Sequence, residues 1–196
     1  MKNLLSITSK SNLMKSLFTL LTAALVLTVS SCQKAAVEPQ VLSNDQGKVD
    51  TPEGTCPATE VNLIAGQTIN SGTVTVTNDA AYIYVTYTTA PGWYMTQTHL
   101  FVGDCNAVPV NGQGNPMPGQ FPYANNHNNA TSYTYQVPIS AIPAGGCGCI
   151  AAHAVVVQMN ASGQVIQTQT GWGNGIRINP TGGNWGMKFS YCSCVQ

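Results

Sequence analysis

The chain has 196 residues, of which 43% are hydrophobic and only 7% are charged, with seven basic and seven acidic side chains. This length suits one folded domain. A charged fraction far below the roughly 25% of ordinary soluble domains excludes a basic nucleic-acid-binding protein, an acidic disordered tail and a charge-rich coiled coil. The polar surface must therefore consist mainly of amides, hydroxyls and glycine.

The first elements of the chain form a predicted export signal. Residues 17–29 are an apolar run, LFTLLTAALVLTV, which follows two lysines and precedes two serines and a cysteine. A basic flank, an apolar stretch too short to span a bilayer and a small-residue exit predict a secretory signal peptide over residues 1–31, rather than a buried core helix. Met14 is an alternative start to Met1, because residues 14–31 already form a complete signal.

The end of this signal carries a resemblance. Val29-Ser30-Ser31-Cys32 resembles the lipobox of bacterial lipoproteins, and the continuation into Gln33-Lys34 is similar to those of Bacteroidota-type cell envelopes. The resemblance covers only the first 34 residues. It implies that Cys32 is acylated and becomes the mature N-terminus, so that acyl chains anchor the exported protein to the cell envelope, expected to be the outer membrane. Both a periplasmic and an external orientation remain open.

The stretch after the lipobox is predicted to be a tether. Residues 32–55 begin with the acylated cysteine and then contain six charged side chains, no aromatic residue and no sustained apolar period. Such a composition is typical of disordered chain, which at this length spans roughly 25 Å. Counted from Cys32 with its amine acylated, seven acids and four bases give the mature protein a net charge of −3.

Residues 56–196 are predicted to form an all-β domain, an antiparallel β-sandwich or jelly roll of about seven to nine strands. Alternating β-branched and aromatic residues between Gly, Pro and Asn turns indicate these strands. In chain order the strands are expected at residues 60–64, 73–77, 82–87, 94–102, 132–137, 149–159, 164–170 and 185–194. Residues 103–131 break the pattern and are expected to form an ordered loop over one end or face.

Six cysteines remain after Cys32, and an exported domain is expected to use them in three disulfides. They are Cys56, Cys105, Cys147, Cys149, Cys192 and Cys194. If the two Cys-x-Cys strand ends are antiparallel neighbours, Cys147 pairs with Cys194 and Cys149 with Cys192, which leaves Cys56 for Cys105. A four-thiolate zinc site is the alternative interpretation, and export to an oxidising compartment disfavours it.

Two histidines in predicted strands are candidates for chemistry. Strict alternation places His99 on the strand face that also carries Trp93, Met95, Gln97 and Phe101. With His153 and Asp104 it would form a metal or acid–base site, so a metal-dependent enzyme is one alternative function, and a purely structural role for both histidines is the other. His127 lies among asparagines and is expected in a solvated loop.

Other catalytic patterns are weak. The domain contains three carboxylates, Glu60, Asp79 and Asp104, and their spacing indicates no glycosidase pair. No Gly-x-Ser-x-Gly elbow and no phosphate-binding glycine loop occur. No cofactor is therefore expected, and the protein is interpreted as non-catalytic.

Aromatic and amide side chains indicate the preferred function. Trp93, Trp172 and Trp185 all lie beside glycines, where an indole can stay uncovered for stacking against a sugar ring, and the alternative interpretation places all three in the core. We expect a glycan-binding domain, and the candidate ligand-binding residues are Trp172, Trp185, Phe121, Tyr123, Asn174 and Asn184. A structural or adhesive protein that binds another protein through a sheet edge or apolar patch is the alternative. The threonine row at residues 73, 75 and 77 is expected to face solvent, and ordering of water or ice by it is a further alternative.

Overall fold

The structure is a computed structural model that describes residues 57–194. The predicted signal peptide, Cys32, the tether and Cys56 lie outside the described residues. The described part contains ten strands and two short 3-10 turns: β1 (Thr59–Ala65), β2 (Ile69–Asn78), β3 (Tyr82–Thr89), β4 (Trp93–Gly103), η1 (Pro118–Gln120), β5 (Tyr123–Ala130), β6 (Ser132–Pro138), η2 (Ile139–Ala141), β7 (Cys147–Met159), β8 (Val165–Gly173), β9 (Ile176–Arg177) and β10 (Met187–Cys192). Within residues 57–194, no helix has the length and apolar character needed to cross a membrane.

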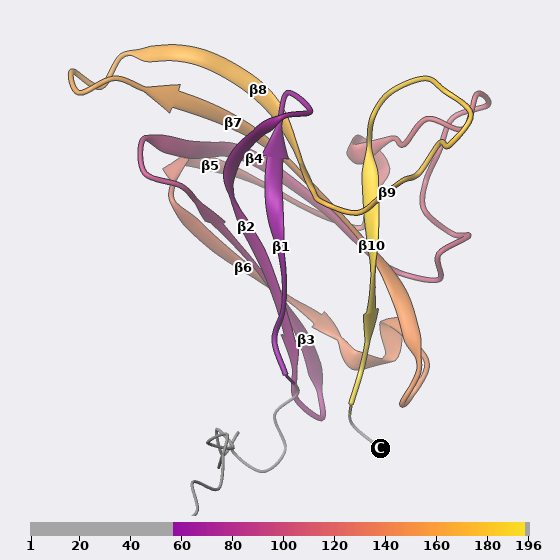
Figure 1. Cartoon of the computed structure of the whole chain (residues 1–196). Helices are drawn as coiled ribbons and strands as arrows, with labels where there is room; N and C mark the ends of the chain where they lie inside the picture. Colours follow the sequence, from indigo (N-terminus) through magenta and orange to yellow (C-terminus); the bar gives the residue numbers. More distant parts are fainter. Residues whose placement is uncertain (1–56, 195–196) are drawn as a thin grey trace, which may run out of the picture. The chain divides into compact units, whose positions relative to one another are not determined.

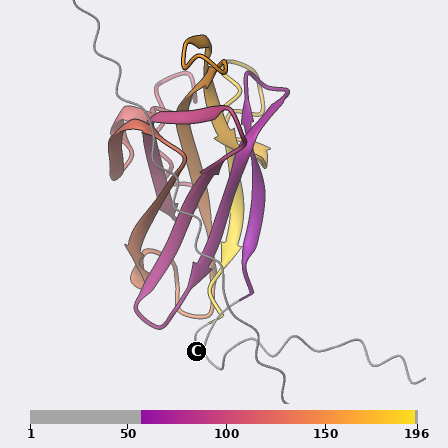
Figure 2. The same ribbon diagram turned by 90° about the vertical axis from the view of Figure 1, so that its left-hand side faces the viewer.

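The strands form one antiparallel sheet that is nearly closed into a barrel (Figures 1 and 2). Its order is β5-β4-β7-β8-β1-β2-β3-β6, with β10 added beside β7 and β9 beside β10. This confirms the predicted all-β, antiparallel, disulfide-containing class. The two sheets of the expected sandwich are joined into one sheet by β8. This strand pairs with β7 along most of its length and with β1 through its last residues. The strands at the two ends of the order, β5 and β6, follow each other directly in the chain around Thr131.

Alternation in the strands produces the main core. Every second residue of β2 and β3 points inward, which buries an apolar row on each strand against rows from the opposite part of the sheet. The fully buried side chains include Leu63, Val74, Val76, Ile83, Val85, Tyr87, Met95, Leu100, Ile150 and Val156. Each buried aliphatic side chain contributes about 1.5–3 kcal/mol to folding. The core therefore holds the sheet in its curved form.

A β-bulge in β4 changes which residues share a face. The register of β4 shifts between Met95 and Gln97: β4 has one additional residue relative to β7, whereas β5 has two additional residues relative to β4. Trp93 and Met95 therefore point into the core, whereas His99 points to the outer face. The prediction that His99 shares a face with Trp93 and Met95 is wrong, because an inserted residue reverses the alternation beyond it.

The expected loop at residues 103–131 contains β5, which sequence reasoning missed. Its sequence, YANNHNNA, is rich in asparagine, a residue depleted in strands. The strand forms because β4 provides an edge for pairing from Met95 to Leu100. A side-chain bond from Gln97 Nε2 to Asn126 Oδ1, 3.1 Å long, supports the same pairing. His127 thus belongs to a strand and not to a solvated loop.

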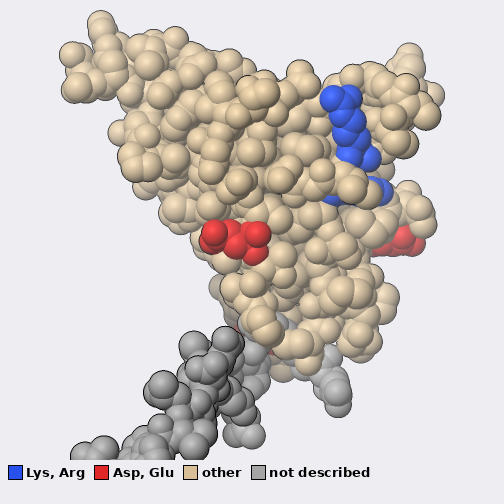
Figure 3. Space-filling model, in the orientation of Figure 1, with Lys and Arg blue, Asp and Glu red and all other residues tan. Residues whose placement is uncertain are grey.

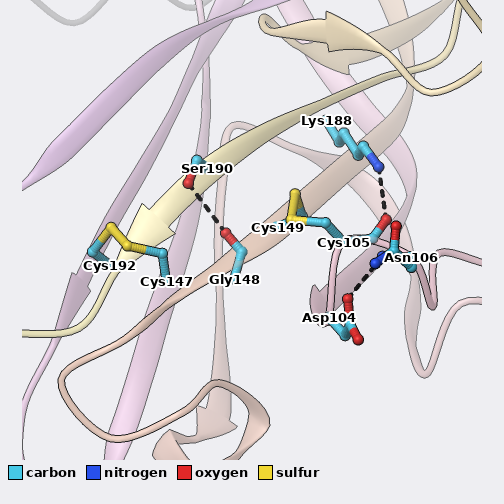
Figure 4. Close-up of a disulfide and its surroundings, with 9 residues drawn as sticks. All are labelled: Asp104, Cys105, Asn106, Cys147, Gly148, Cys149, Lys188, Ser190 and Cys192. Atoms are coloured by element: carbon cyan, nitrogen blue, oxygen red, sulfur yellow. Dashed lines mark hydrogen bonds between the residues drawn. A yellow bond between two sulfur atoms is a disulfide. The ribbon is translucent and has the colours of Figure 1, made fainter.

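Two disulfides have both of their cysteines within residues 57–194, and their pairing differs from the prediction (Figure 4). Cys147 is bonded to Cys192, its direct partner in the β7–β10 register. Cys149 lies opposite Gly103 at the end of β4 and is bonded to Cys105, two residues further along the chain. The predicted Cys147–Cys194, Cys149–Cys192 and Cys56–Cys105 pairs are therefore wrong; Cys194 is disulfide-bonded as well. Disulfides persist in oxidising compartments, so the bonds indicate an extracellular or envelope location.

A second apolar cluster lies on the outer face of β4, β7 and β8. It contains Phe101, Val108, Phe121, Ala151 and Trp172, with Ile178, Trp185 and Met187 packed against it. Two loops, residues 104–122 and 174–186, contribute to this cluster and lie side by side (Figure 1). Asn179 Nδ2 donates to the carbonyl of Gln113 at 2.9 Å, and the Asn184 amide donates to Asn115 Oδ1 at 2.9 Å. The two loops therefore support each other.

Candidate functional site

The predicted ligand-binding residues do not lie at one site: the tryptophans and Phe121 lie at the second apolar cluster, and Tyr123 lies on β5. Trp172 and Phe121 are only 3% and 5% exposed, and their rings pack edge to face in the second apolar cluster. They present no ring face to a ligand. Trp185 is half-buried at the margin of this cluster. Asn184, which directly precedes it, and Asn174, which follows β8, are exposed. Of the proposed indole platform, only Trp185 is accessible, since Trp93 is buried in the main core.

Tyr123 belongs to a different surface, the gap between β5 and β6 at the two ends of the strand order. No backbone ladder joins β5 to β6 within residues 57–194. Side chains bridge the two strands instead: the Thr98 hydroxyl on β4 lies 2.7 Å from His127 Nε2 on β5 and 2.8 Å from the Tyr135 hydroxyl on β6. We call the four rings along this line, Tyr123, His127, Tyr133 and Tyr135, the tyrosine seam.

The rings of the tyrosine seam form a continuous row. Ring centroids are 6.2 Å apart for Tyr123 and Tyr135, 4.8 Å for Tyr135 and Tyr133, and 4.7 Å for Tyr133 and His127. Tyr135 is buried, whereas the other three rings are half-buried and reach the surface. Asn125, also half-buried, lies between Tyr123 and His127 in β5. The seam thus combines aromatic faces with an amide at one accessible place.

Part of the tyrosine seam was visible in the sequence. Tyr123 was predicted as a ligand-binding residue, and Tyr133 and Tyr135 occur in a predicted strand with alternating pattern. Sequence reasoning missed Tyr133 and the contribution of His127. The available signal was the close sequence spacing of these aromatic residues around Thr131, but their common location depends on β5, which was not predicted.

The two strand histidines do meet, as predicted, but Asp104 is not with them. His99 and His153 are direct partners in the β4–β7 register, and their Nδ1 atoms are 3.1 Å apart. Asp104 lies five residues beyond His99, about 16 Å of extended chain. Its side chain accepts the Asn106 amide in a turn. The described residues contain no group of three metal-ligating His, Cys, Asp or Glu side chains, so the predicted His99–His153–Asp104 site is wrong.

Both members of this histidine pair are neutral at pH 7. Burial lowers the pKa of His99. Burial, and then repulsion from a charged His99, lowers the pKa of His153 to about 3. The Trp172 ring packs edge-on against His153 at a centroid distance of 4.9 Å. His153 is therefore a rigidly placed, uncharged imidazole.

The three carboxylates of the described domain lie in separate settings. Glu60 accepts a hydrogen bond from Thr75 on β2, and Asp79 accepts bonds from the Tyr84 hydroxyl and two backbone amides of its turn. The Tyr84 hydroxyl is the main cause of the lowered pKa of Asp79. Asp104 lines a cavity of about 540 Å³ beside the disulfides, and it is the one carboxylate among the lining residues. This arrangement provides no carboxylate pair for glycoside hydrolysis.

The outer face of β1, β2, β3 and β6 carries hydroxyl rows. Thr75, Thr86 and Thr134 are consecutive partners across β2, β3 and β6, and the hydroxyls of Thr86 and Thr134 are 2.8 Å apart. The row at residues 73, 75 and 77 is half-buried and continues this face. The face is therefore polar, and the Glu60 carboxylate on β1, which accepts a hydrogen bond from Thr75, adds a charge to it.

Exposed apolar side chains are scattered. The large ones in the described part are Tyr82, Val110, Val165, Ile166 and Ile176. Val165 and Ile166 are neighbours on β8, in the projecting β7–β8 hairpin, and alternation points them to opposite faces. Val165 and Ile166 therefore do not form one apolar patch of the kind that the protein-binding alternative needs.

The surface carries few charges. Residues 57–194 contain Glu60, Asp79, Asp104, Arg177 and Lys188. On the face drawn in Figure 3, basic and acidic side chains form small separate patches among uncharged residues. Lys188 Nζ donates to the Cys105 carbonyl at 2.7 Å (Figure 4).

In comparisons with known proteins, no family model, curated protein or solved structure matches the chain.

Proposed function

We propose that this domain binds a neutral extracellular glycan without catalysis, through the tyrosine seam. The observation that carries the proposal is the row of half-buried rings, Tyr123, His127 and Tyr133, beside the amide of Asn125. Aromatic rings with a polar tip provide an apolar face for sugar C–H groups and a hydrogen-bonding end for hydroxyls. Asparagine amides both donate and accept, which matches the mixed hydrogen bonding of sugar hydroxyls.

The charge of the domain supports a neutral ligand. Five charged side chains over residues 57–194 provide no field that would attract a polyanion or a polycation. The outer strands carry threonine, asparagine and glutamine instead. A ligand that presents many hydroxyls and no charge is complementary to this surface. Among extracellular polymers, neutral polysaccharides have this chemistry.

The accessible surface also favours the tyrosine seam over the first predicted site. Burial of Trp172 and Phe121 leaves Trp185 as one ring at the edge of the second apolar cluster. The tyrosine seam provides three rings that reach the surface in one row. A sugar chain longer than one residue needs such an extended platform. We therefore assign Trp172 and Phe121 to the scaffold and keep Tyr123 from the predicted set.

A neutral-glycan array tests the function. The full-length protein, produced with its disulfides intact, is expected to bind neutral oligosaccharides and to bind sulfated or uronic-acid glycans more weakly. The Tyr133→Ala variant is expected to weaken binding by about tenfold, because loss of a central aromatic contact costs about 1–2 kcal/mol of binding free energy. Tyr82→Ala is the matched control, since Tyr82 is a 42% exposed tyrosine of β3 that is not part of the tyrosine seam.

The result that refutes the proposal is equally definite. Absence of binding to every neutral glycan, or equal loss in Tyr133→Ala and Tyr82→Ala, contradicts binding at the tyrosine seam. Tyr133→Phe keeps the ring and is expected to retain most of the affinity. Near-ultraviolet circular dichroism of each variant establishes that the fold is intact.

We also propose that a lipid on Cys32 holds the domain at the outer membrane. The support is the resemblance of residues 29–32 to a lipobox, together with disulfides that indicate an extracellular or envelope location. Several buried acyl chains, at about 0.8 kcal/mol per methylene, are sufficient for stable anchoring. Cys32→Ser is expected to move the protein from the membrane fraction to the soluble fraction and to abolish palmitate labelling. Retention of the label in Cys32→Ser would refute the assignment.

A further inference from the structure

The histidine pair on the outer face of the sheet is unusual for its position. His99 and His153 lie directly opposite each other on β4 and β7, two extensively paired strands of the sheet. Both side chains are more than nine-tenths buried. The neighbours of His153 on the same face of β7 are Ala151 and Val155. A polar pair that replaces apolar side chains at such a site costs desolvation free energy and needs a compensating interaction.

A mutual hydrogen bond compensates only part of this cost. The two Nδ1 atoms are 3.1 Å apart, so one imidazole can donate its proton to the other. Each neutral ring carries one N–H, and a single bond therefore uses one donor and one acceptor of the pair. Neither Nε2 atom has a protein partner within the described part of the chain, and neither is fully buried. The two Nε2 atoms are thus left to solvent, and the two Nδ1 atoms face each other across β4 and β7.

The spacing of the two nitrogens matches a metal chelate. Metal–imidazole bonds of about 2.0–2.1 Å with an angle between 90° and the tetrahedral value place two ligand nitrogens about 2.8–3.4 Å apart. The observed 3.1 Å lies within this interval. We propose that His99 and His153 bind one divalent transition metal ion through their Nδ1 atoms, with Cu²⁺ bound most tightly because it leads the affinity order for imidazole sites.

The surroundings support a preformed chelate. Both histidines are fixed by the paired strands, and the edge-on contact with Trp172 orients the His153 ring. The pair points to the outer face of β4 and β7, whereas the tyrosine seam follows Thr98, which points inward. The metal proposal is therefore independent of glycan binding.

Titration of the full chain with Cu²⁺ tests the site. Calorimetry is expected to give one Cu²⁺ per chain, with quenching of Trp172 fluorescence, because that indole touches His153. His153→Asn is expected to lower the affinity by about tenfold or more, since one of two protein ligands is lost. His127→Gln is the matched control: the chain has three histidines, and the third is expected to be dispensable for Cu²⁺.

Electron paramagnetic resonance of the unmutated protein makes the test independent of variant folding. Two imidazole nitrogens on the bound Cu²⁺ are expected in its hyperfine pattern. The proposal is overturned by absence of stoichiometric binding, by a spectrum without two nitrogen ligands, or by binding that survives in His153→Asn and is lost in His127→Gln. Glycan affinity measured on the same samples is expected to be unchanged by Cu²⁺, so failure of one proposal is distinguishable from failure of the other.

Discussion

The Cys147→Ala, Cys192→Ala double variant is expected to lower the free energy of unfolding by about 4 kcal/mol, because the bond closes a long loop in the unfolded chain. The bonded cysteines are 45 residues apart in sequence. They join the start of β7 to the end of β10, a strand that pairs with β7 at four positions and otherwise with the two-residue β9. Without the bond, β10 keeps its ladder to β7 and the buried Phe189 and Tyr191, so the expected loss is that of the loop closure. Urea unfolding under non-reducing conditions measures this change.

Ser190→Ala serves as the control for this prediction. Ser190 is an exposed residue of β10 in the ladder with β7. Its hydroxyl makes one weak contact of 3.5 Å with the Gly148 carbonyl (Figure 4). We expect a change within about 0.5 kcal/mol, as for most surface substitutions. A loss below about 1 kcal/mol in the cysteine variant would contradict the assigned role of the bond.

Trp172→Ala is expected to lower the free energy of unfolding by about 3–5 kcal/mol, because it leaves a cavity where a large buried ring was packed. Trp172 is 3% exposed and contacts Phe121 and His153. It lies where the two loops meet the sheet, so the cavity weakens both the loop cover and the outer face of β7. Thermal and urea unfolding measure the loss.

The matched variant is Trp185→Ala. This indole is half-buried at the margin of the same cluster, and its removal is expected to cost about 1 kcal/mol or less, because water can fill the space. A similar loss in both variants, or a loss below about 1 kcal/mol for Trp172→Ala, would show that the second apolar cluster does not depend on Trp172. The comparison also separates a scaffold tryptophan from a ligand-binding one.

The strands could be predicted because alternation is a local signal. The expected strands at residues 73–77, 82–87 and 132–137 lie within β2, β3 and β6. β5 could not be predicted, because its asparagines disfavour strands and its stability comes from pairing with β4. The bulge between Met95 and Gln97 could not be predicted either, because the residues there show no pattern that is typical of a bulge.

The predicted disulfide pairing is wrong because the predicted register between β7 and β10 differs by two residues from the observed one. The prediction placed Cys149 opposite Cys192, whereas the β7–β10 ladder places Cys147 there and Ser190 opposite Cys149. Register depends on the total packing of both strands and not on the cysteines themselves. With β4 on its other side, Cys149 then lies within reach of Cys105.

The candidate site was predicted only in its residue types. Aromatic and amide side chains were identified as the ligand-binding groups, and Tyr123 was among them. The sequence does not show which rings are covered, because coverage of Trp172 depends on two loops that are far apart in the chain. The His99–His153 contact was anticipated, because both histidines lie in predicted strands, but no sequence rule excluded Asp104 from it.

The most direct test of glycan binding at the tyrosine seam compares this surface with the surface around Trp185, using one neutral glycan. Affinities for the strongest neutral glycan of the array are measured for the full-length protein and for Tyr133→Ala and Trp185→Ala. The tyrosine seam predicts about tenfold weaker binding for Tyr133→Ala and unchanged binding for Trp185→Ala. Loss of binding in Trp185→Ala with full affinity in Tyr133→Ala would contradict it and place the ligand beside the second apolar cluster.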